Sequence, residues 1–198
     1  MVYLVGEKVL LRDIVKEDIE DRIRWETKEV EWQEWDAPWE NDQCSFCEEK
    51  YKQSLLKKIE ATEQVDHFRY GFEICENSKE KKHIGWVNAY YIDENYAYTK
   101  EKKNIAIGIN IPEISSRRKG YATEAWILFI NYILDNGVED IYTQTWSGNS
   151  RVIGLMGKIG FLECRRLKGV REVRGERFDA LTFKLDIKIF RNIAANID

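Results

Sequence analysis

The sequence feature that most constrains the fold lies in the middle of the chain, at residues 105–136. Isoleucine occupies every second position from Ile105 to Ile111, which places four isoleucines on one face of a β-strand. Pro112 ends this strand, and a helical pattern with an apolar stripe follows from 123 to 136: Ala125, Trp126, Phe129, Ile130 and Ile133. Gly137 stands where a left-handed C-terminal cap belongs. This succession predicts a helix that packs back onto a sheet.

The rest of the chain predicts more strands and helices in mixed order. Ser45 and Glu48 form a capping-box pattern at the start of a second helix. Residues 26–49 otherwise favour a loop, residues 168–176 a charged loop, and residues 187–198 a short helical tail. The expected strands are 8–12, 68–75, 83–93, 105–111, 140–146, 161–167 and 177–185, with helices starting near 16, 45, 123 and 150. This order predicts an α/β protein with a mixed sheet and helices on both faces.

Composition narrows the class of protein. The 198 residues carry 31 Lys and Arg against 35 Asp and Glu, and the resulting net charge of −4 gives no general attraction to nucleic acid or anionic membranes. The longest apolar stretch, 125–134, contains Asn131 and is too short to span a membrane. Cys44 and Cys47 have no second pair of metal ligands near them in the sequence. We predict a cytoplasmic protein without a metal, with one domain at 1–186 and a tail at 187–198.

The turn between the isoleucine strand and its helix is basic and contains one glycine. It reads Arg117, Arg118, Lys119, Gly120. A glycine turn at a helix N-terminus exposes backbone N–H groups at the positive end of the helix dipole, and this arrangement binds anions such as a pyrophosphate. The alternative is an ordinary turn with three solvated cations.

Three segments together resemble one known family. Residues 117–125 are similar to the acetyl-CoA-binding motif of the GNAT superfamily of N-acetyltransferases, written [Arg/Gln]-x-x-Gly-x-[Gly/Ala]. Asn149 followed by residues 158–161 resembles the family's Asn…Lys-x-Gly-Phe segment, and residues 175–179 resemble the RimJ/RimL-like branch, which acetylates ribosomal proteins. The similarity covers residues 7–186. It implies the GNAT fold, a mixed central sheet of about seven strands that splay apart between the fourth and the fifth, and acetyl-CoA as co-substrate.

The resemblance also implies which residues hold acetyl-CoA. The turn would hold the pyrophosphate through backbone N–H groups of Arg117, Arg118, Lys119, Gly120, Tyr121, Ala122 and Thr123. The strand would pair with the pantetheine amides through Ile109, Asn110 and Ile111. Asn149 would contact the cofactor or order water near the thiol, and Arg151 is a candidate for the phosphates.

Catalytic residues are less well defined by the resemblance. Many family members have a tyrosine as general acid where this chain has Met156, and the branch often has a serine where it has Val152. Asn149 stays a candidate catalytic residue. An amine must lose its proton to attack a thioester, and Glu113 is the first candidate base, with Glu34, Asp36 and Asp179 as others. For each carboxylate the alternative is a solvated surface group.

Residues 26–49 are acidic and rich in tryptophan. Nine carboxylates against Lys28 alone give this segment a net charge of −8. Carboxylates attract cationic amines and aromatic rings bind ammonium groups, so we predict that it lines the acceptor site, together with Trp86. The candidate acceptor residues are Trp32, Glu34, Trp35, Asp36 and Trp86. Alternatively, the tryptophans close the core and the acids keep a long loop soluble.

The sequence thus predicts an enzyme that transfers acetyl from acetyl-CoA to a primary amine by direct attack in a ternary complex. A cationic small molecule and a protein N-terminus both fit as the acceptor, and aminoglycosides and polyamines are the small-molecule alternatives. A domain that binds acyl-CoA without turnover is the alternative of another class. The apolar residues of the tail suggest a homodimer.

Overall fold

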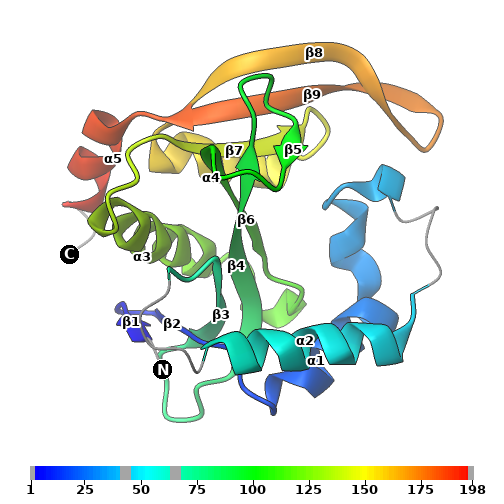
Figure 1. Cartoon of the computed structure of the whole chain (residues 1–198), viewed down its shortest axis with the longest axis vertical. Coiled ribbons are helices and arrows are strands. Elements are labelled where there is room, and N and C mark those ends of the chain that lie inside the picture. Colours follow the sequence, from blue (N-terminus) through cyan, green and yellow to red (C-terminus); the bar gives the residue numbers. More distant parts are fainter. Residues whose placement is uncertain (1–2, 41–45, 63–67, 196–198) are drawn as a thin grey trace.

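The computed structural model describes residues 3–40, 46–62 and 68–195; Cys44 and Ser45 lie outside them. Its sheet has nine strands in the order β1-β2-β3-β4-β6-β7-β9-β8, and β5 pairs with β4 (Figure 1). The strands are β1 (Tyr3–Val5), β2 (Val9–Arg12), β3 (Gly71–Glu76), β4 (His83–Ile92), β5 (Tyr98–Thr99), β6 (Asn104–Asn110), β7 (Ile141–Trp146), β8 (Phe161–Val173) and β9 (Glu176–Leu185). The helices are α1 (Asp18–Thr27), α2 (Glu48–Thr62), α3 (Tyr121–Asp135), α4 (Ser150–Ile159) and α5 (Ile187–Ala194).

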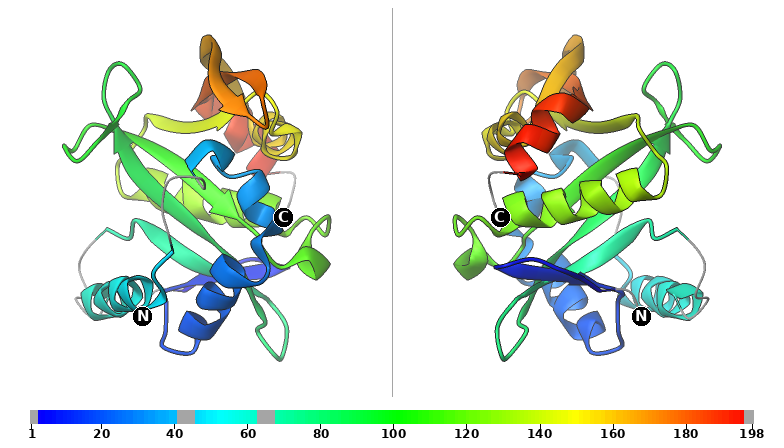
Figure 2. Two further views of the ribbon diagram at one scale, coloured as in Figure 1. Left: turned by 90° about the vertical axis from the view of Figure 1, so that its right-hand side faces the viewer. Right: turned by 90° about the vertical axis from the view of Figure 1, so that its left-hand side faces the viewer.

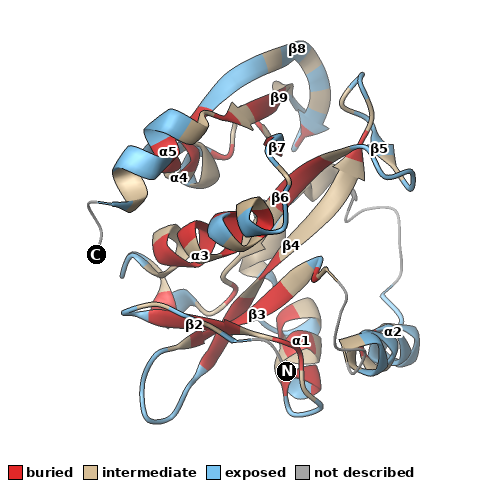
Figure 3. Cartoon of the chain, turned by 60° about the vertical axis from the view of Figure 1, so that its left-hand side comes forward, coloured by how far each residue is buried: buried red, intermediate tan, exposed pale blue. Residues whose placement is uncertain are grey.

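Helices cover both faces of the sheet, as expected. In the right-hand view of Figure 2, α3 and α5 lie in front of the sheet, whereas α1 and α2 lie behind it. The apolar stripe predicted for α3 is fully buried, and the central strands contribute their alternating residues to the same core (Figure 3). Gly137 follows the C-cap residue Asn136 and has φ +81°, which confirms the predicted left-handed glycine at the end of this helix.

The two central strands separate soon after they meet. β6 is antiparallel to β4 over seven residue pairs, but its parallel pairing with β7 comprises only Ile105–Ile141 and Ala106–Tyr142. Beyond Ala106 the strands diverge. Because β6 and β7 correspond to the fourth and fifth expected strands, the predicted splay is confirmed.

The structure corrects several expected boundaries. The strands β1 and β5 are too short to show a periodic pattern, so about seven strands were expected where nine are present. The charged loop expected at 168–176 is instead a continuation of the β8–β9 hairpin, which turns at Arg174 and Gly175 with φ +54° and +80°. Two consecutive residues with positive φ are typical of a tight hairpin turn. The segment expected to be mostly loop also contains two 3₁₀ turns, η1 (Val30–Glu34) and η2 (Pro38–Glu40).

Residues 187–194 of the predicted C-terminal tail form the helix α5. Asp186 caps it by accepting hydrogen bonds from the N–H groups of Lys188 and Ile189. Phe190 is fully buried in the main core, so the helix packs on the same core as the preceding strands. A homodimer formed through the tail stays a prediction. Among the described residues, none of the helices combines the length and the apolar character needed to cross a membrane.

Candidate active site

A cleft of about 1630 Å³ opens where β6 and β7 separate. Both strands line it, through residues 107–111 and 143–146. The turn before α3 and the first turns of α4 form one half of its wall. Residues 31–39 form the other half together with the β8–β9 hairpin. We call these the turn half and the segment half.

The turn half is shaped by its backbone. Gly120 has φ +86° and Arg118 has φ +61°, and α3 begins at the next residue, Tyr121. No side chain caps this helix, so its first N–H groups lack partners within the helix and Tyr121, Ala122 and Thr123 line the cleft. A Cβ on Gly120 would approach only the Lys8 side chain, at 3.5 Å, so the positive φ is what requires glycine here. This geometry suits an anionic group such as a pyrophosphate.

Two arginines flank the turn half. Arg117 donates from Nε to the carbonyl of Ile111 (2.8 Å) and from Nη2 to that of Pro112 (3.1 Å), and its Nη1 pairs with Glu31. Arg151 pairs with the other oxygen of Glu31 at 3.0 Å. Both arginines line the cleft, as does Arg118, whereas Lys119 lies outside it.

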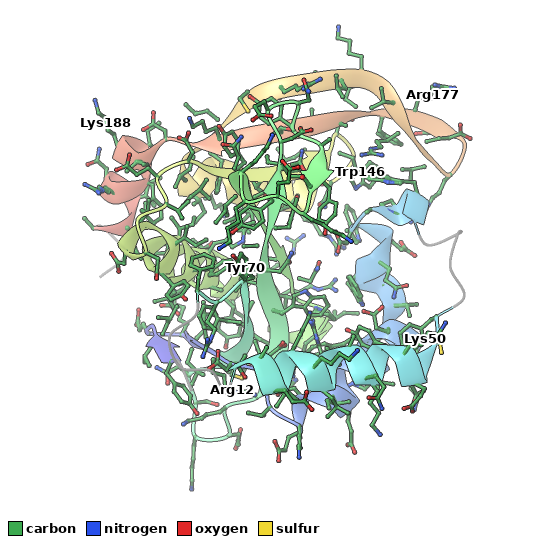
Figure 4. All side chains as sticks on the ribbon, viewed as in Figure 1. Arg12, Lys50, Tyr70, Trp146, Arg177 and Lys188 are labelled. Carbon is green, nitrogen blue, oxygen red and sulfur yellow. The ribbon has the colours of Figure 1, made fainter. Side chains whose placement is uncertain are left out.

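Asn149 joins the two halves. Its side-chain oxygen accepts the N–H of Val152 at 3.2 Å and so caps α4, and its amide nitrogen donates to the carbonyl of Trp35 at 2.9 Å. The indole of Trp146 donates to the same carbonyl at 2.9 Å. Trp146, labelled in Figure 4, lies below the β8–β9 hairpin, where its ring packs edge-on against Phe178. The end of β7 therefore holds the segment half in place.

The segment half places one carboxylate beside β6. Asn110 donates to Asp36 at 3.0 Å, and Trp32, Trp35 and Trp39 line the cleft around it. The structure therefore brings together three of the predicted acceptor residues, Trp32, Trp35 and Asp36.

Two other predicted acceptor residues lie outside the cleft. Trp86 stacks on Trp25 under the guanidinium of Arg22 at 3.6 Å, and it meets the cleft residue Trp32 edge-on, with ring centroids 5.2 Å apart. Glu34 pairs with Arg174 at the tip of the hairpin, at 3.0 Å.

Glu113 also lies outside the cleft. It accepts a hydrogen bond from Ser115 and pairs with Lys82 at 3.3 Å and Arg24 at 3.7 Å. Partial burial acts to raise the pKa of Glu113, but the Ser115 bond and the two cations outweigh it and lower the pKa below its usual value. A carboxylate held ionised by cations is a weaker base than one whose pKa is raised.

The carboxylates of residues 26–36 all have hydrogen-bond or ion-pair partners within the protein. Glu26 accepts from Gln33, Glu29 pairs with Arg24 at 3.1 Å, and the other three have the partners given above. Burial raises the pKa of Glu26. The segment therefore presents much less negative charge to the cleft than its composition suggests.

Part of the cleft could not be anticipated from the sequence. The hairpin contributes Arg165, Leu167 and Arg171, and β4 contributes Tyr90, whose hydroxyl donates to Gln144 at 3.3 Å. Sheet pairing over long sequence distances brings these residues to the cleft, and no local motif marks them.

A sequence profile described as "Acetyltransferase (GNAT) domain" matches residues 8–162. The chain belongs to the GNAT acetyltransferase family. GNAT enzymes use acetyl-CoA, so this protein is an acetyl-CoA-dependent acetyltransferase. No protein of curated function matches the sequence.

Solved structures share the fold of this GNAT acetyltransferase. A GNAT-family acetyltransferase from Bacillus anthracis is 17% identical, with a TM-score of 0.64 over 93% of this chain and 98% of that one. The ribosomal-protein-S5-alanine acetyltransferase of Vibrio fischeri is also 17% identical, with a TM-score of 0.68 over 93% and 96%. RimL, the ribosomal L7/L12 N-terminal acetyltransferase, in complex with coenzyme A, is 13% identical, with a TM-score of 0.68 over 92% and 97%.

The position expected to hold a general acid faces away from the cleft in this GNAT acetyltransferase. Met156 is fully buried in the main core, whereas Val152, Leu155 and Lys158 of the same helix line the cleft. The helical period thus turns position 156 inward, so a tyrosine there would meet the core.

Proposed function

We propose that this GNAT enzyme transfers the acetyl group of acetyl-CoA directly to the amine of a polypeptide N-terminus. The observation that carries the proposal is a single cleft that joins an anion-binding turn to a carboxylate surrounded by aromatic rings, Asp36. Both sites line the cleft that opens where β6 and β7 separate.

The turn half fits acetyl-CoA. Its uncapped helix N-terminus and the cations of the turn would bind the pyrophosphate. The carbonyl of Ile107 still accepts the hydroxyl of Thr143 on β7, and beyond it the backbone of β6 would pair with the pantetheine amides. The residues of the cleft that would hold acetyl-CoA are Ile109, Asn110, Ile111, Arg117, Arg118, Gly120, Tyr121, Ala122, Thr123, Asn149 and Arg151; Lys119, predicted with them, lies outside the cleft.

The segment half would position the amine. Acetyl-CoA supplies a thioester, whose acetyl carbon bonds to the amine nitrogen while its carbon–sulfur bond breaks and the thiol leaves with a proton. Asp36 would attract the ammonium and accept its proton through water, and Trp32 and Trp35 would exclude bulk solvent from it. An N–H of β6 near Ile109 would stabilise the developing negative charge on the acetyl oxygen.

The charges of the cleft favour one ammonium group over several. Only two carboxylates, Glu31 and Asp36, line the described part of the cleft, and Glu31 is paired with two arginines. Arg165 and Arg171 line the same half and would repel a polycation. This favours a peptide N-terminus over a polyamine or an aminoglycoside. The names of RimL and of the S5-alanine enzyme point to the same class of acceptor.

Release of free thiol from acetyl-CoA tests the proposal. Peptides with varied N-terminal residues, polyamines and aminoglycosides are supplied as separate pools. We expect release above the amine-free blank only with the peptides, and none with the same peptides blocked at the N-terminus. Release with polyamines or aminoglycosides alone would contradict the acceptor class. Binding of acetyl-CoA with no release in any pool would favour an acyl-CoA-binding module.

A further inference from the structure

Glu31 connects the two halves of the cleft through its charge. One of its oxygens pairs with Arg117, and the other pairs with Arg151 at 3.0 Å and accepts the indole N–H of Trp35 at 3.0 Å. Arg117 comes from the turn before α3 and Arg151 from the first turn of α4, so two separate elements meet on one carboxylate of the opposite wall.

Each of the two arginines has a further contact besides Glu31. Arg117 is held by its bonds to the carbonyls of Ile111 and Pro112. Arg151 lies over the ring of Trp35 at 3.9 Å. The two guanidinium groups thus form a prearranged site for an anion, and Glu31 is the anion that occupies it.

We propose that Glu31 is an internal substitute for the phosphates of acetyl-CoA, which must displace it from Arg117 and Arg151 on binding. This inference rests on the acetyl-CoA site proposed above. The exchange is open to solvent, because the side chains of Arg117, Arg151 and Glu31 are 20%, 47% and 35% exposed. Exposed ion pairs are weak, so a phosphate of higher charge replaces a carboxylate readily.

The protonation state of Glu31 is consistent with this role. Its slight burial acts to raise its pKa, but the bonds from Arg117, Trp35 and Arg151 outweigh it and lower the pKa below the usual value. Glu31 is therefore a carboxylate at neutral pH and competes with phosphate by charge.

Displacement of Glu31 would change how the residues of the proposed acceptor site are held. Glu31 lies in η1, and Trp35 and Asp36 follow it directly in the chain. Once Glu31 leaves the arginines, the bonds of Asn149 and Trp146 to the Trp35 carbonyl still hold the segment. Acetyl-CoA thus loosens one attachment of the acceptor wall and leaves the other, which couples the two substrates.

Calorimetry on the unliganded protein tests the proposal, with acetyl-CoA and with S-acetylpantetheine, which lacks the nucleotide phosphates. We expect Glu31→Gln to bind acetyl-CoA about 3- to 10-fold more tightly than the unaltered protein, which corresponds to the value of one or two exposed ion pairs. Its affinity for S-acetylpantetheine should not change. Glu29→Gln is the matched control, because it removes an equal charge from a carboxylate paired with Arg24 and should change neither affinity.

The other outcomes separate this inference from the proposed function. Unchanged or weaker acetyl-CoA binding by Glu31→Gln, while the unaltered protein binds well, overturns the role of Glu31 and leaves the acetyl-CoA site standing. An equal gain for S-acetylpantetheine also overturns it, because the effect would not depend on phosphate. Failure of the unaltered protein to bind acetyl-CoA contradicts both. Should Glu31→Gln not fold, Glu31→Asp is the second variant, because it keeps the charge but withdraws it from the arginines by one methylene. It should bind acetyl-CoA more tightly than the unaltered protein, by less than the gain expected for Glu31→Gln.

Discussion

The two halves of the cleft are built by different means. In the turn half, backbone conformation positions the groups that would bind acetyl-CoA: a positive φ at Gly120, an uncapped helix end and the free edge of β6. In the segment half, side chains do this work, through hydrogen bonds from Trp146 and Asn149 to Trp35 that span 111 and 114 residues of sequence.

The two halves are also attached to the core differently. Glu124 fastens the first turn of α3 by accepting the backbone N–H groups of Glu7, Lys8 and Val9 at 2.9, 2.8 and 2.7 Å. The helix α1, which leads into the segment half, is fastened by titratable side chains: His83 contacts Asp21 at 3.1 Å and Glu73 at 2.8 Å. Loss of the proton from His83 should therefore weaken the attachment of the segment half.

The largest effect is expected from the titration of His83. Burial acts to lower its pKa, but the hydrogen bonds that the ring donates to Asp21 and Glu73 and the charges of Glu73 and Asp18 outweigh it and raise the pKa to about 9. The stabilisation is complete below the unfolded pKa of about 6.5 and is lost as the pH rises through about 9. We expect the free energy of unfolding in urea to fall by on the order of 3 kcal/mol between pH 6 and pH 10.

The His83→Gln variant is the control for this titration. It should be less stable at pH 6, and its stability should vary much less over the same range. A parallel fall in both proteins would show that other groups titrate there.

The second effect tests the backbone of the turn half. Gly120→Val places a β-branched residue at φ +86°, so we expect acetyl-CoA affinity to drop about 100-fold in calorimetry. Gly137→Val introduces comparable strain at the other end of α3, where φ is +81° and no atom lies within 4 Å of the added Cβ. It should lower stability but leave acetyl-CoA affinity intact. Equal losses of affinity would mean that the turn acts only through helix stability.

The third effect tests the carboxylate of the segment half. Asp36→Asn removes the charge that would attract the ammonium, and we expect kcat/KM for a peptide acceptor to fall about 10-fold while acetyl-CoA affinity is unchanged. Glu48→Gln, which removes an exposed charge at the start of α2, is the matched control. An unchanged kcat/KM in Asp36→Asn would remove this residue from the proposed mechanism.

The smallest effect is expected at the hairpin. Arg171 lies over Trp39 at 4.3 Å and lines the cleft. Arg171→Gln removes a cation–π contact worth about 0.5–1 kcal/mol that positions Trp39, and we expect this loss to outweigh the removal of one repelling cation and to raise the KM of a peptide acceptor about 3-fold. Arg177→Gln alters an exposed arginine of the same hairpin and should have no effect on KM (Figure 4). If the two variants behave alike, the hairpin does not contact the acceptor.

The sequence alone determined the parts of this protein that depend on local order. The alternating isoleucines, the apolar stripe of α3 and the glycine turn between them follow from residues near one another in the chain, because backbone periodicity and turn conformation are short-range properties. The splay of β6 and β7 was expected only from the resemblance to the GNAT family. These features define the fold and the turn half of the cleft.

Only the tertiary structure decided the partners of the charged groups. Glu31 pairs with Arg117, 86 residues away in sequence, and Glu113 pairs with Lys82 outside the cleft. Met156 is buried in the core. Which ion pair a carboxylate forms depends on the cation that the fold brings within a few ångströms of it. No local sequence pattern encodes that distance. The proposed acceptor side of this acetyltransferase therefore depends on long-range packing, whereas the proposed acetyl-CoA side follows from a local sequence motif.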